Sequence, residues 1–334
     1  MLRTRFTGLV GCRVPLQMAG MGQLATPRLA AAVADAGGLG MVGVSGGPPE
    51  YVAKALGETR RMTSGMFGAN FIVAGLRDTP TGEIDPELAP ALEQAASRAR
   101  VVEFFYADPE PSLVDSTHAG GALACWQVGS LGEAIAAEKA GCDLIVAQGT
   151  EAGGHVRGRT GLLALLGDVL PAVRVPVVAA GGIGTGRAMA AALAAGASAV
   201  RVGTRFVAAA ESEAHPRYVE RLIAAEAKDT VLTEAFSANW PNAPHRVLRA
   251  SVEAMERFPS EVVGERVYEW DPEKRVPAQR GASMVPMRST TGEIDAMPHW
   301  AGESVSAVKR VQPAAEIVRE LVEEAESLLR SGTR

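Results

Sequence analysis

The stretch that decides the fold is residues 143–155, DLIVAQGTEAGGH. Its first half is a short, continuous apolar run, which is typical of a strand covered on both faces of a parallel sheet. Its second half turns to glycine and ends in a single histidine, His155. Glycine lets a backbone come close to a flat ligand or a phosphate, and an imidazole titrates near neutral pH. The stretch therefore predicts a buried strand that delivers one histidine to a ligand site.

Seven further apolar runs accompany this one, at residues 14–19, 39–45, 67–73, 101–107, 122–128, 175–180 and 199–206. Helices are expected between them at residues 27–36, 49–61, 86–99, 131–140 and 186–195. Eight strand–helix units in succession predict an α/β protein that folds as a (β/α)8 TIM barrel. An open, doubly wound sheet is the alternative, and the nearly even spacing favours the closed barrel.

The regular alternation of predicted strands and helices ends after residue 206. Residues 208–280 are predicted to be mostly helical, residues 281–303 to form an extended loop, and residues 304–330 to form a final amphipathic helix. We therefore expect residues 1–207 and 300–334 to form the barrel. Residues 208–299 would form a helical insertion, or lid, over its mouth.

Composition excludes several classes of protein. The chain has 334 residues, 47% of them hydrophobic, and a net charge of −5 without a long basic run, which argues against nucleic-acid binding. No uninterrupted apolar stretch reaches the roughly 18 residues of a membrane span. The three cysteines (Cys12, Cys125 and Cys142) form no CxxC pair, and the N-terminus lacks a signal-peptide core, so a cytoplasmic location is expected. Carboxylates and histidines do not cluster at metal-ligand spacing, and no metal is predicted.

Glycines end the last two predicted strands, in AAGGIG at residues 179–184 and GTR at residues 203–205. Backbone amides at such turns can hold an anion, and these two strand ends are the usual phosphate position of the barrel. Gly181, Gly182, Gly203 and Thr204 are therefore candidate phosphate ligands. A single glycine would more simply permit a tight turn, but two adjacent strand ends favour the phosphate site. The GIGTG at residues 182–186 is not a Rossmann fingerprint, because no acidic residue ends a following strand.

The other polar candidates are weaker. His118, His215 and His245 lie in polar, loop-like contexts and are expected to be solvated, whereas His299 either lines the site or only packs. Glu151 is expected to brace the glycine loop or to cap the helix that follows it.

Taken together, these motifs resemble the nitronate monooxygenase family of FMN-dependent TIM-barrel flavoproteins over essentially the whole chain. The resemblance rests on PLQMAGM at residues 15–21, FGAN at 67–70, QGTEAGGH at 148–155, AAGGI at 179–183, GTRF at 203–206 and WAGE at 300–303. The same family contains NADH:quinone reductases and FabK-type enoyl-acyl-carrier reductases, so the pattern is less specific for one activity.

The resemblance implies FMN as the cofactor and His155 as the active-site histidine. It implies that the backbone of Ala19, Gly20 and Met21 meets the flavin ring and that Asn70 bonds the flavin or its ribityl chain. Gln127 stands where the family has a polar residue near the flavin, and some relatives have a lysine there. Gly181, Gly182, Gly203 and Thr204 match the clasp for the FMN phosphate.

The implied activity is oxidation of an alkyl nitronate by O2 to a carbonyl compound and nitrite, with His155 as hydrogen-bond partner or acid/base. Neutral nitroalkanes become substrates if His155 also removes the α-proton. The alternatives are an NAD(P)H-dependent reductase of a quinone or an enoyl thioester and a non-catalytic flavin-binding barrel. A sugar-phosphate isomerase or synthase is disfavoured, because only Glu103 and Glu151 stand near the strand ends. The expected partner is a small molecule (nitronate, NAD(P)H or quinone), and a homodimer is compatible with this fold.

Overall fold

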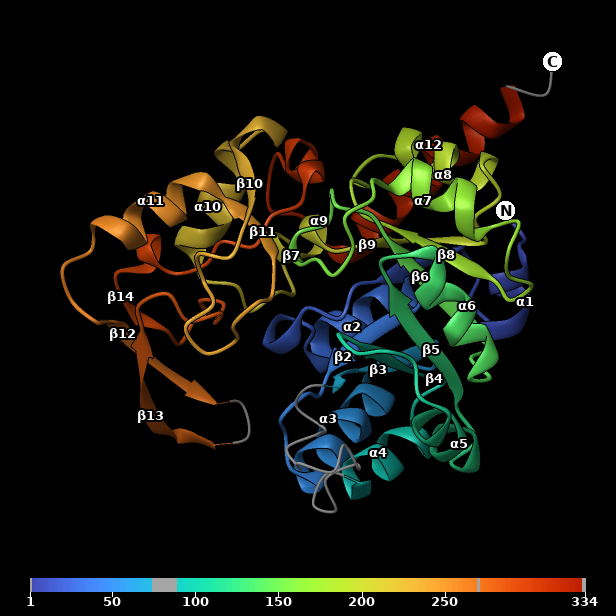
Figure 1. Ribbon diagram of the computed structural model, residues 1–334, viewed down its shortest axis with the longest axis horizontal. Coiled ribbons are helices and arrows are strands. Elements are labelled where there is room, and N and C mark those ends of the chain that lie inside the picture. Colours follow the sequence, from blue (N-terminus) through green and yellow to red (C-terminus); the bar gives the residue numbers. More distant parts are fainter. Residues whose placement is uncertain (1, 74–88, 269–270, 332–334) are drawn as a thin grey trace.

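The computed structural model describes residues 2–73, 89–268 and 271–331, and it contains the predicted barrel (Figure 1). Eight parallel strands form one sheet in the order β1-β9-β8-β6-β5-β4-β3-β2. They are β1 (Leu16–Met18), β2 (Gly40–Gly43), β3 (Phe67–Ile72), β4 (Val101–Phe105), β5 (Leu123–Val128), β6 (Leu144–Gln148), β8 (Val177–Ala180) and β9 (Ala199–Val202). Each lies within one of the eight predicted runs.

The sheet closes between its first and last strands. The amide of Leu39, just before β2, donates to the carbonyl of Leu16 at 2.8 Å, and the amide of Met18 donates to Leu39 at 2.9 Å. Gln17 and Leu39 form a parallel bridge. Since β1 also pairs with β9, no strand of this sheet keeps a free edge, and the prediction of a TIM barrel is confirmed.

A ring of helices covers the barrel, and α12 (Ala314–Ser331) completes it by packing against α8 and α2. The others are α2 (Pro27–Asp35), α3 (Pro49–Met62), α4 (Ala89–Ala96), α5 (Pro111–Ala119), α6 (Leu131–Lys139), α7 (Leu162–Val169) and α8 (Gly186–Ala194). The sequence did not predict α5 and α7, and the first residues of the helix expected at 86–99 lie outside the described ranges. A short helix, α1 (Arg5–Val10), precedes the barrel.

The main core lies between the strands and this ring. Phe71, Phe104 and Trp126 come from three neighbouring strands and are fully buried, with ring centroids 6.3 Å and 5.0 Å apart in turn. Because side chains alternate along a strand, Asn70, Glu103 and the other neighbours of these aromatic residues face the barrel interior.

The region after β9 is mixed, and the prediction of a mostly helical insertion is wrong. It holds α9 (Thr204–Val207), α10 (Pro216–Ala224) and α11 (Arg249–Arg257), the 3-10 turns η3 (Ala227–Asp229), η4 (Ile294–Ala296) and η5 (Glu303–Ala307), and five strands. The strands are β10 (Thr230–Thr233), β11 (His245–Leu248), β12 (Val262–Tyr268), β13 (Asp271–Gln279) and β14 (Thr291–Gly292). The final helix begins at Ala314 and not at residue 304, because residues 303–307 form η5.

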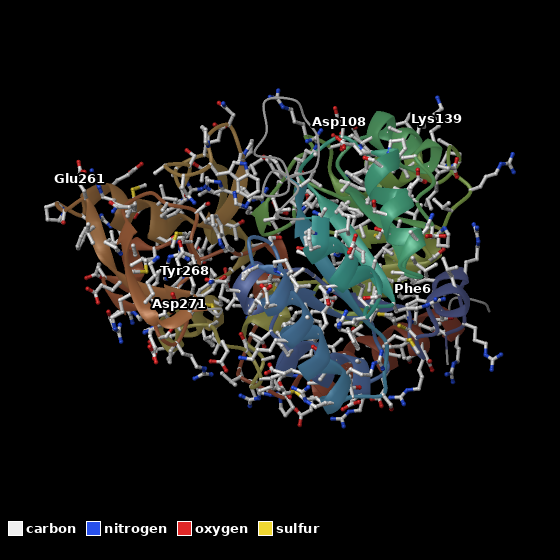
Figure 2. The ribbon with its side chains drawn as sticks, turned by 90° about the horizontal axis from the view of Figure 1, so that it is seen from below. Phe6, Asp108, Lys139, Glu261, Tyr268 and Asp271 are labelled. Atoms are coloured by element: carbon white, nitrogen blue, oxygen red, sulfur yellow. The ribbon has the colours of Figure 1, made fainter. Side chains whose placement is uncertain are left out.

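The strands of this region build two small antiparallel sheets. In one, β11 is the central strand and pairs with β10 on one side and with β7 (Gly154–His155) on the other; β7 follows β6 of the barrel. In the other, β12 pairs with β13 and β14. Figure 2 shows Glu261, Tyr268 and Asp271 at one end of the molecule, with Phe6 and Lys139 at the other. The division of the chain at residues 207/208 and 299/300 stays a prediction.

Candidate active site

One cavity of about 440 Å³ opens at the carboxyl ends of the barrel strands, a size that suits a small ligand. Its wall contains every residue that the sequence singled out for the site. They are Ala19, Gly20, Met21, Asn70, Gln127, His155, Gly181, Gly182, Gly203 and Thr204. The structure thus brings together residues from six strand ends, while their individual roles stay predictions.

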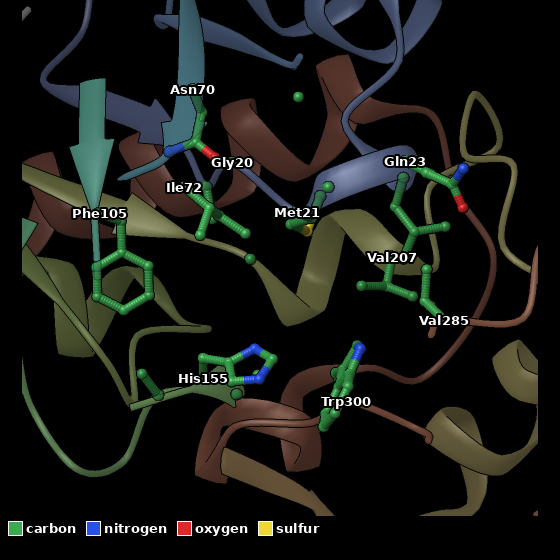
Figure 3. Close-up of a pocket in the computed structure, with 18 of the residues that line it drawn as sticks. Gly20, Met21, Gln23, Asn70, Ile72, Phe105, His155, Val207, Val285 and Trp300 are labelled. Carbon is green, nitrogen blue, oxygen red and sulfur yellow. The ribbon is translucent and has the colours of Figure 1, made fainter. Parts of the chain in front are cut away.

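The floor of the cavity is bare backbone that follows β1. A Cβ atom on Gly20 would lie 2.3 Å from Cγ of Asn70, so no larger residue fits there without displacing that amide. In Figure 3, Gly20 and Met21 lie across the cavity from His155 and Trp300. The arrangement leaves room for a flat group between the backbone and the imidazole.

The glycine turns after β8 and β9 form one end of the cavity. Gly181 and Gly182 have φ values of 111° and 69°, which glycine adopts readily and other residues adopt with strain. Within the described ranges, the amide nitrogens of Gly182, Gly203 and Thr204 donate to no protein acceptor. Thr204 Oγ1 accepts from the amide of Gly302 at 3.1 Å, which fixes this turn against the residues before η5. Free amides on two neighbouring turns are suited to an anion such as a phosphate.

The helix contribution to this anion site differs between the two turns. The turn after β8 leads into α8, a helix of nine residues, whereas the turn after β9 leads only into α9, which has four. A helix N-terminus of full length therefore supports the anion site only at the turn after β8.

His155 ends the opening stretch as part of β7 and lies among aromatic rings. Its ring centroid is 4.1 Å from that of Trp240, 5.4 Å from that of Trp300 and 5.8 Å from that of Tyr106. Nε2 is buried and has no hydrogen-bond partner in the described part of the chain. Burial, assisted by the nearby His245, lowers the pKa of His155 to about 3. The imidazole is therefore neutral at neutral pH, and its Nε2 is not bonded to any described residue.

Glu151 holds the loop that carries His155. Both carboxylate oxygens accept from the amide of Leu162, at 2.9 and 3.0 Å, at the start of α7. The structure places the side chain where the sequence analysis expected it, as a cap on the following helix. A carboxylate at a helix N-terminus is favourable both as a hydrogen-bond acceptor and as a negative charge.

The structure corrects the expectation for His245. It is fully buried, because β11 pairs with β7 and places it opposite His155. The three other histidines serve the structure: His118 contacts Asp143 at 2.8 Å, His215 caps α10, and His299 is buried and stacked on Tyr218.

The sequence analysis missed Arg201, a buried cation in the cavity wall. It forms an ion pair with Glu103, which is fully buried in β4, and donates a hydrogen bond to Gln127. The available signal was a charged residue inside each of two otherwise apolar strands. Pairing across the barrel explains both, since a buried charge needs a partner.

Residues of the insertion complete the outer wall. Asn239 and Trp240 come from the segment before β11, and Arg266 and Tyr268 come from β12. The guanidinium carbon of Arg266 lies 4.2 Å from the ring centroid of Tyr268, and its buried Nε has no partner within residues 2–73, 89–268 and 271–331. The insertion thus brings aromatic surface and one cation to the mouth.

The described residues contain no group of three or more His, Cys, Asp or Glu side chains arranged to bind a metal ion. They also contain no helix that combines the length and the apolar character of a membrane span.

The fold and the cavity define a TIM-barrel protein with a pocket at the carboxyl ends of its strands. Its sequence matches the model of the family described as nitronate monooxygenase over residues 3–324, and the chain belongs to that family. Membership makes the protein an oxidoreductase of a family whose members in general depend on a flavin.

Three similar proteins illustrate the range of the family. The (3aS,4S,5R,7aS)-5-hydroxy-7a-methyl-1-oxo-octahydro-1H-indene-4-carboxyl-CoA dehydrogenase of Rhodococcus jostii (strain RHA1) is 36% identical over 251 residues, which are 75% of this chain and 67% of that one. FabK from Thermotoga maritima is 32% identical with a TM-score of 0.77, covering 100% and 99% of the two chains. A nitroalkane oxidase from Streptomyces ansochromogenes is 28% identical with a TM-score of 0.77, covering 99% and 100%.

Proposed function

We propose that the protein binds FMN and uses it to oxidise alkyl nitronates with O2, giving a carbonyl compound and nitrite. The observation that carries this proposal is His155, a neutral imidazole whose buried Nε2 has no partner among the described residues and whose ring lies across the cavity from the bare glycine floor. A flat cofactor on that floor and an anionic substrate beneath the imidazole would fill the space between them. Similarity to a nitroalkane oxidase supports the same reaction class.

The residues present are compatible with FMN. The free amides of Gly182, Gly203 and Thr204 would hold its phosphate, and the backbone of residues 19–21 would meet its ring. Asn70 and Gln127 would supply polar contacts to the ring or the ribityl chain. Bound there, the flavin would supply the redox chemistry, and the protein would supply position and electrostatics.

The state of His155 bears on which form of the substrate is used. A base whose conjugate acid has a pKa of about 3 removes a proton from carbon poorly. A nitronate has already lost its α-proton and needs only a hydrogen-bond donor at the nitro oxygens, which a neutral imidazole can be. The site therefore favours the preformed nitronate over the neutral nitroalkane.

The test is reduction of the FMN-loaded protein without oxygen, with a nitronate, NADH and NADPH in parallel. Loss of the visible flavin band on adding the nitronate, faster than with either nicotinamide, is the expected result. Rapid loss with NADH or NADPH and none with the nitronate would overturn the proposal. Protein that takes up no FMN would overturn the cofactor assignment itself.

A second candidate is NAD(P)H-dependent reduction, or the reverse oxidation, of an acyl thioester. Two relatives favour it, because the R. jostii protein is named for a carboxyl-CoA substrate and shares more identity than the nitroalkane oxidase, while FabK follows at 32%. Arg266 gives this candidate a structural basis, since a guanidinium at the mouth suits an anionic carrier. Replacing Arg266 with Gln should raise KM for a CoA thioester and leave KM for a small nitronate unchanged.

We also propose that the insertion sets substrate selectivity, in the manner of the predicted lid. Trp240, Arg266 and Tyr268 supply the outer wall, whereas the floor and the glycine turns come from the barrel. Changes in the insertion should therefore alter KM more than FMN occupancy.

A further inference from the structure

A buried polar layer lies beneath the floor of the cavity. Its centre is Glu103, which accepts from Nε2 of Gln17 at 2.9 Å and from Nδ2 of Asn70 at 2.8 Å and pairs with Arg201. All four side chains are buried. Gln17 and Asn70 occupy the strands next to Arg201 and Glu103 and are their register partners. The layer is therefore a connected network that spans the interior of the barrel.

Like Asn70, Arg201 is a member of this network that reaches the cavity. It lines the cavity two residues before Gly203 on the same strand, and its Nη1 donates to Gln127, another lining residue. Its Nε is buried and has no partner among the described residues. Burial lowers the pKa of Arg201 to about 9, so the guanidinium keeps its charge at neutral pH.

An ion pair with a solely structural role explains this arrangement poorly. Transfer of a guanidinium and a carboxylate from water to the interior of a barrel is strongly unfavourable, and a buried donor without an acceptor adds to that cost. Arg201 nevertheless lines the cavity, and this position is explained if the ligand supplies a negative partner for the guanidinium. The network then serves to hold the guanidinium at a fixed place under that ligand.

We propose that Arg201 is the positioning cation of the cofactor site and that it stabilises the negative charge that the flavin ring gains on reduction. This inference rests on the proposed binding of FMN. Uptake of two electrons from the reducing substrate and of one proton from the substrate or the solvent would leave the ring with one negative charge. A fixed positive charge beside it raises the midpoint potential, because charge close to the ring tunes the electronics of a flavin. Glu103 opposes this effect by partly neutralising the guanidinium.

The two members of the ion pair thus have opposite predicted effects on the midpoint potential of bound FMN. Arg201→Gln should lower the midpoint potential of bound FMN by about 30 mV or more, which corresponds to tenfold weaker binding of reduced relative to oxidised flavin. Glu103→Gln should raise the potential, and Arg201→Lys should restore most of the loss. Lost stability alone would not produce shifts of opposite sign.

The measurement is equilibrium reduction of each FMN-loaded protein against a reference dye. Arg100→Gln is the matched control. Arg100 is half-buried, lies just before β4 and away from the cavity, and donates to the carbonyls of Leu9 and Val10. Its loss should leave the midpoint potential unchanged. An unchanged potential in folded, FMN-loaded Arg201→Gln overturns the role of Arg201 alone, whereas a parent protein that binds no FMN overturns the proposed function. If Arg201→Gln does not fold, Glu103→Gln decides, and an unchanged or lower potential there also overturns the inference.

Discussion

His155 and His245 face each other across the antiparallel pair of β7 and β11, with ring centroids 5.5 Å apart. The ring of His245 is fixed at both nitrogens: Nε2 accepts from the amide of Phe236 at 3.1 Å, and Nδ1 lies 2.9 Å from the carbonyl of Ala243. These two bonds require one protonated and one bare nitrogen, which is the neutral form. Burial lowers the pKa of His245 in agreement with this. The neighbour of His155 is thus a rigid, uncharged ring.

Replacing His155 with Asn should lower kcat/KM for the nitronate by about 100-fold or more, which is typical for loss of a group that assists proton transfer or binds a developing charge. FMN should remain bound, because the predicted clasp lies on β8 and β9. Steady-state kinetics and the flavin content of the purified variant test both parts. An unchanged kcat/KM would remove His155 from the mechanism.

The pKa of His155 also predicts how stability depends on pH. The folded protein takes up this proton only near pH 3, while the unfolded chain takes it up near the ordinary value of 6.5. Its contribution to the free energy of unfolding is therefore complete above pH 6.5 and is lost as the pH falls from 6.5 toward 3, with a limiting slope of about 1.4 kcal/mol per pH unit.

Urea unfolding of the FMN-free protein and of His155→Asn at several pH values between about 7 and 4 tests this slope. On acidification the free energy of unfolding should fall less steeply for the variant, by the slope of about 1.4 kcal/mol per pH unit that one proton contributes. His299 stays in both proteins, and burial lowers its pKa to about 4, so it affects both curves equally. Parallel curves for the two proteins would show that His155 is not held neutral by the fold.

The sequence predicts the barrel well and its insertion poorly, for a physical reason. A strand such as β6 is covered on both faces, so its continuous apolar run is visible in the sequence. The hairpin of β12 and β13 is largely exposed and rich in charge, and no periodic apolar face distinguishes it from a charged helix. Its strands are defined by their pairing, which is not encoded locally.

Prediction of the candidate site from the sequence meets the same limit. The glycine turns and His155 follow predicted strands directly, so their placement at the mouth follows from the fold. Burial of His245 depends on β11 returning to β7, and the place of Arg201 depends on Glu103 across the barrel. Neither relationship is visible within one segment of the chain.

Gly182 is a position where the predicted clasp should be sensitive to substitution. Its φ of 69° disfavours any other residue, and a Cβ there would lie 3.3 Å from Cβ of Glu151. Gly182→Leu should therefore displace the turn and lower FMN occupancy, measured as the ratio of flavin to protein absorbance. Gly132→Leu is the control, because Gly132 is exposed on α6 with no atom within 4 Å of its Cβ position. Full occupancy in Gly182→Leu would exclude this turn from the phosphate site.

Trp240 should help to exclude water from the imidazole of His155. Its ring centroid is 4.1 Å from that of His155 at an interplanar angle of 31°, and burial is the main cause of the low pKa of that histidine. Trp240→Ala should admit water, raise the pKa of His155 toward its ordinary value and raise KM by removing apolar contact with the substrate. Trp240→Phe keeps a ring in place and should preserve most of both properties. The NMR titration of the His155 ring protons reports the pKa directly, and a titration that is unchanged in folded Trp240→Ala would show that other walls of the cavity exclude the water.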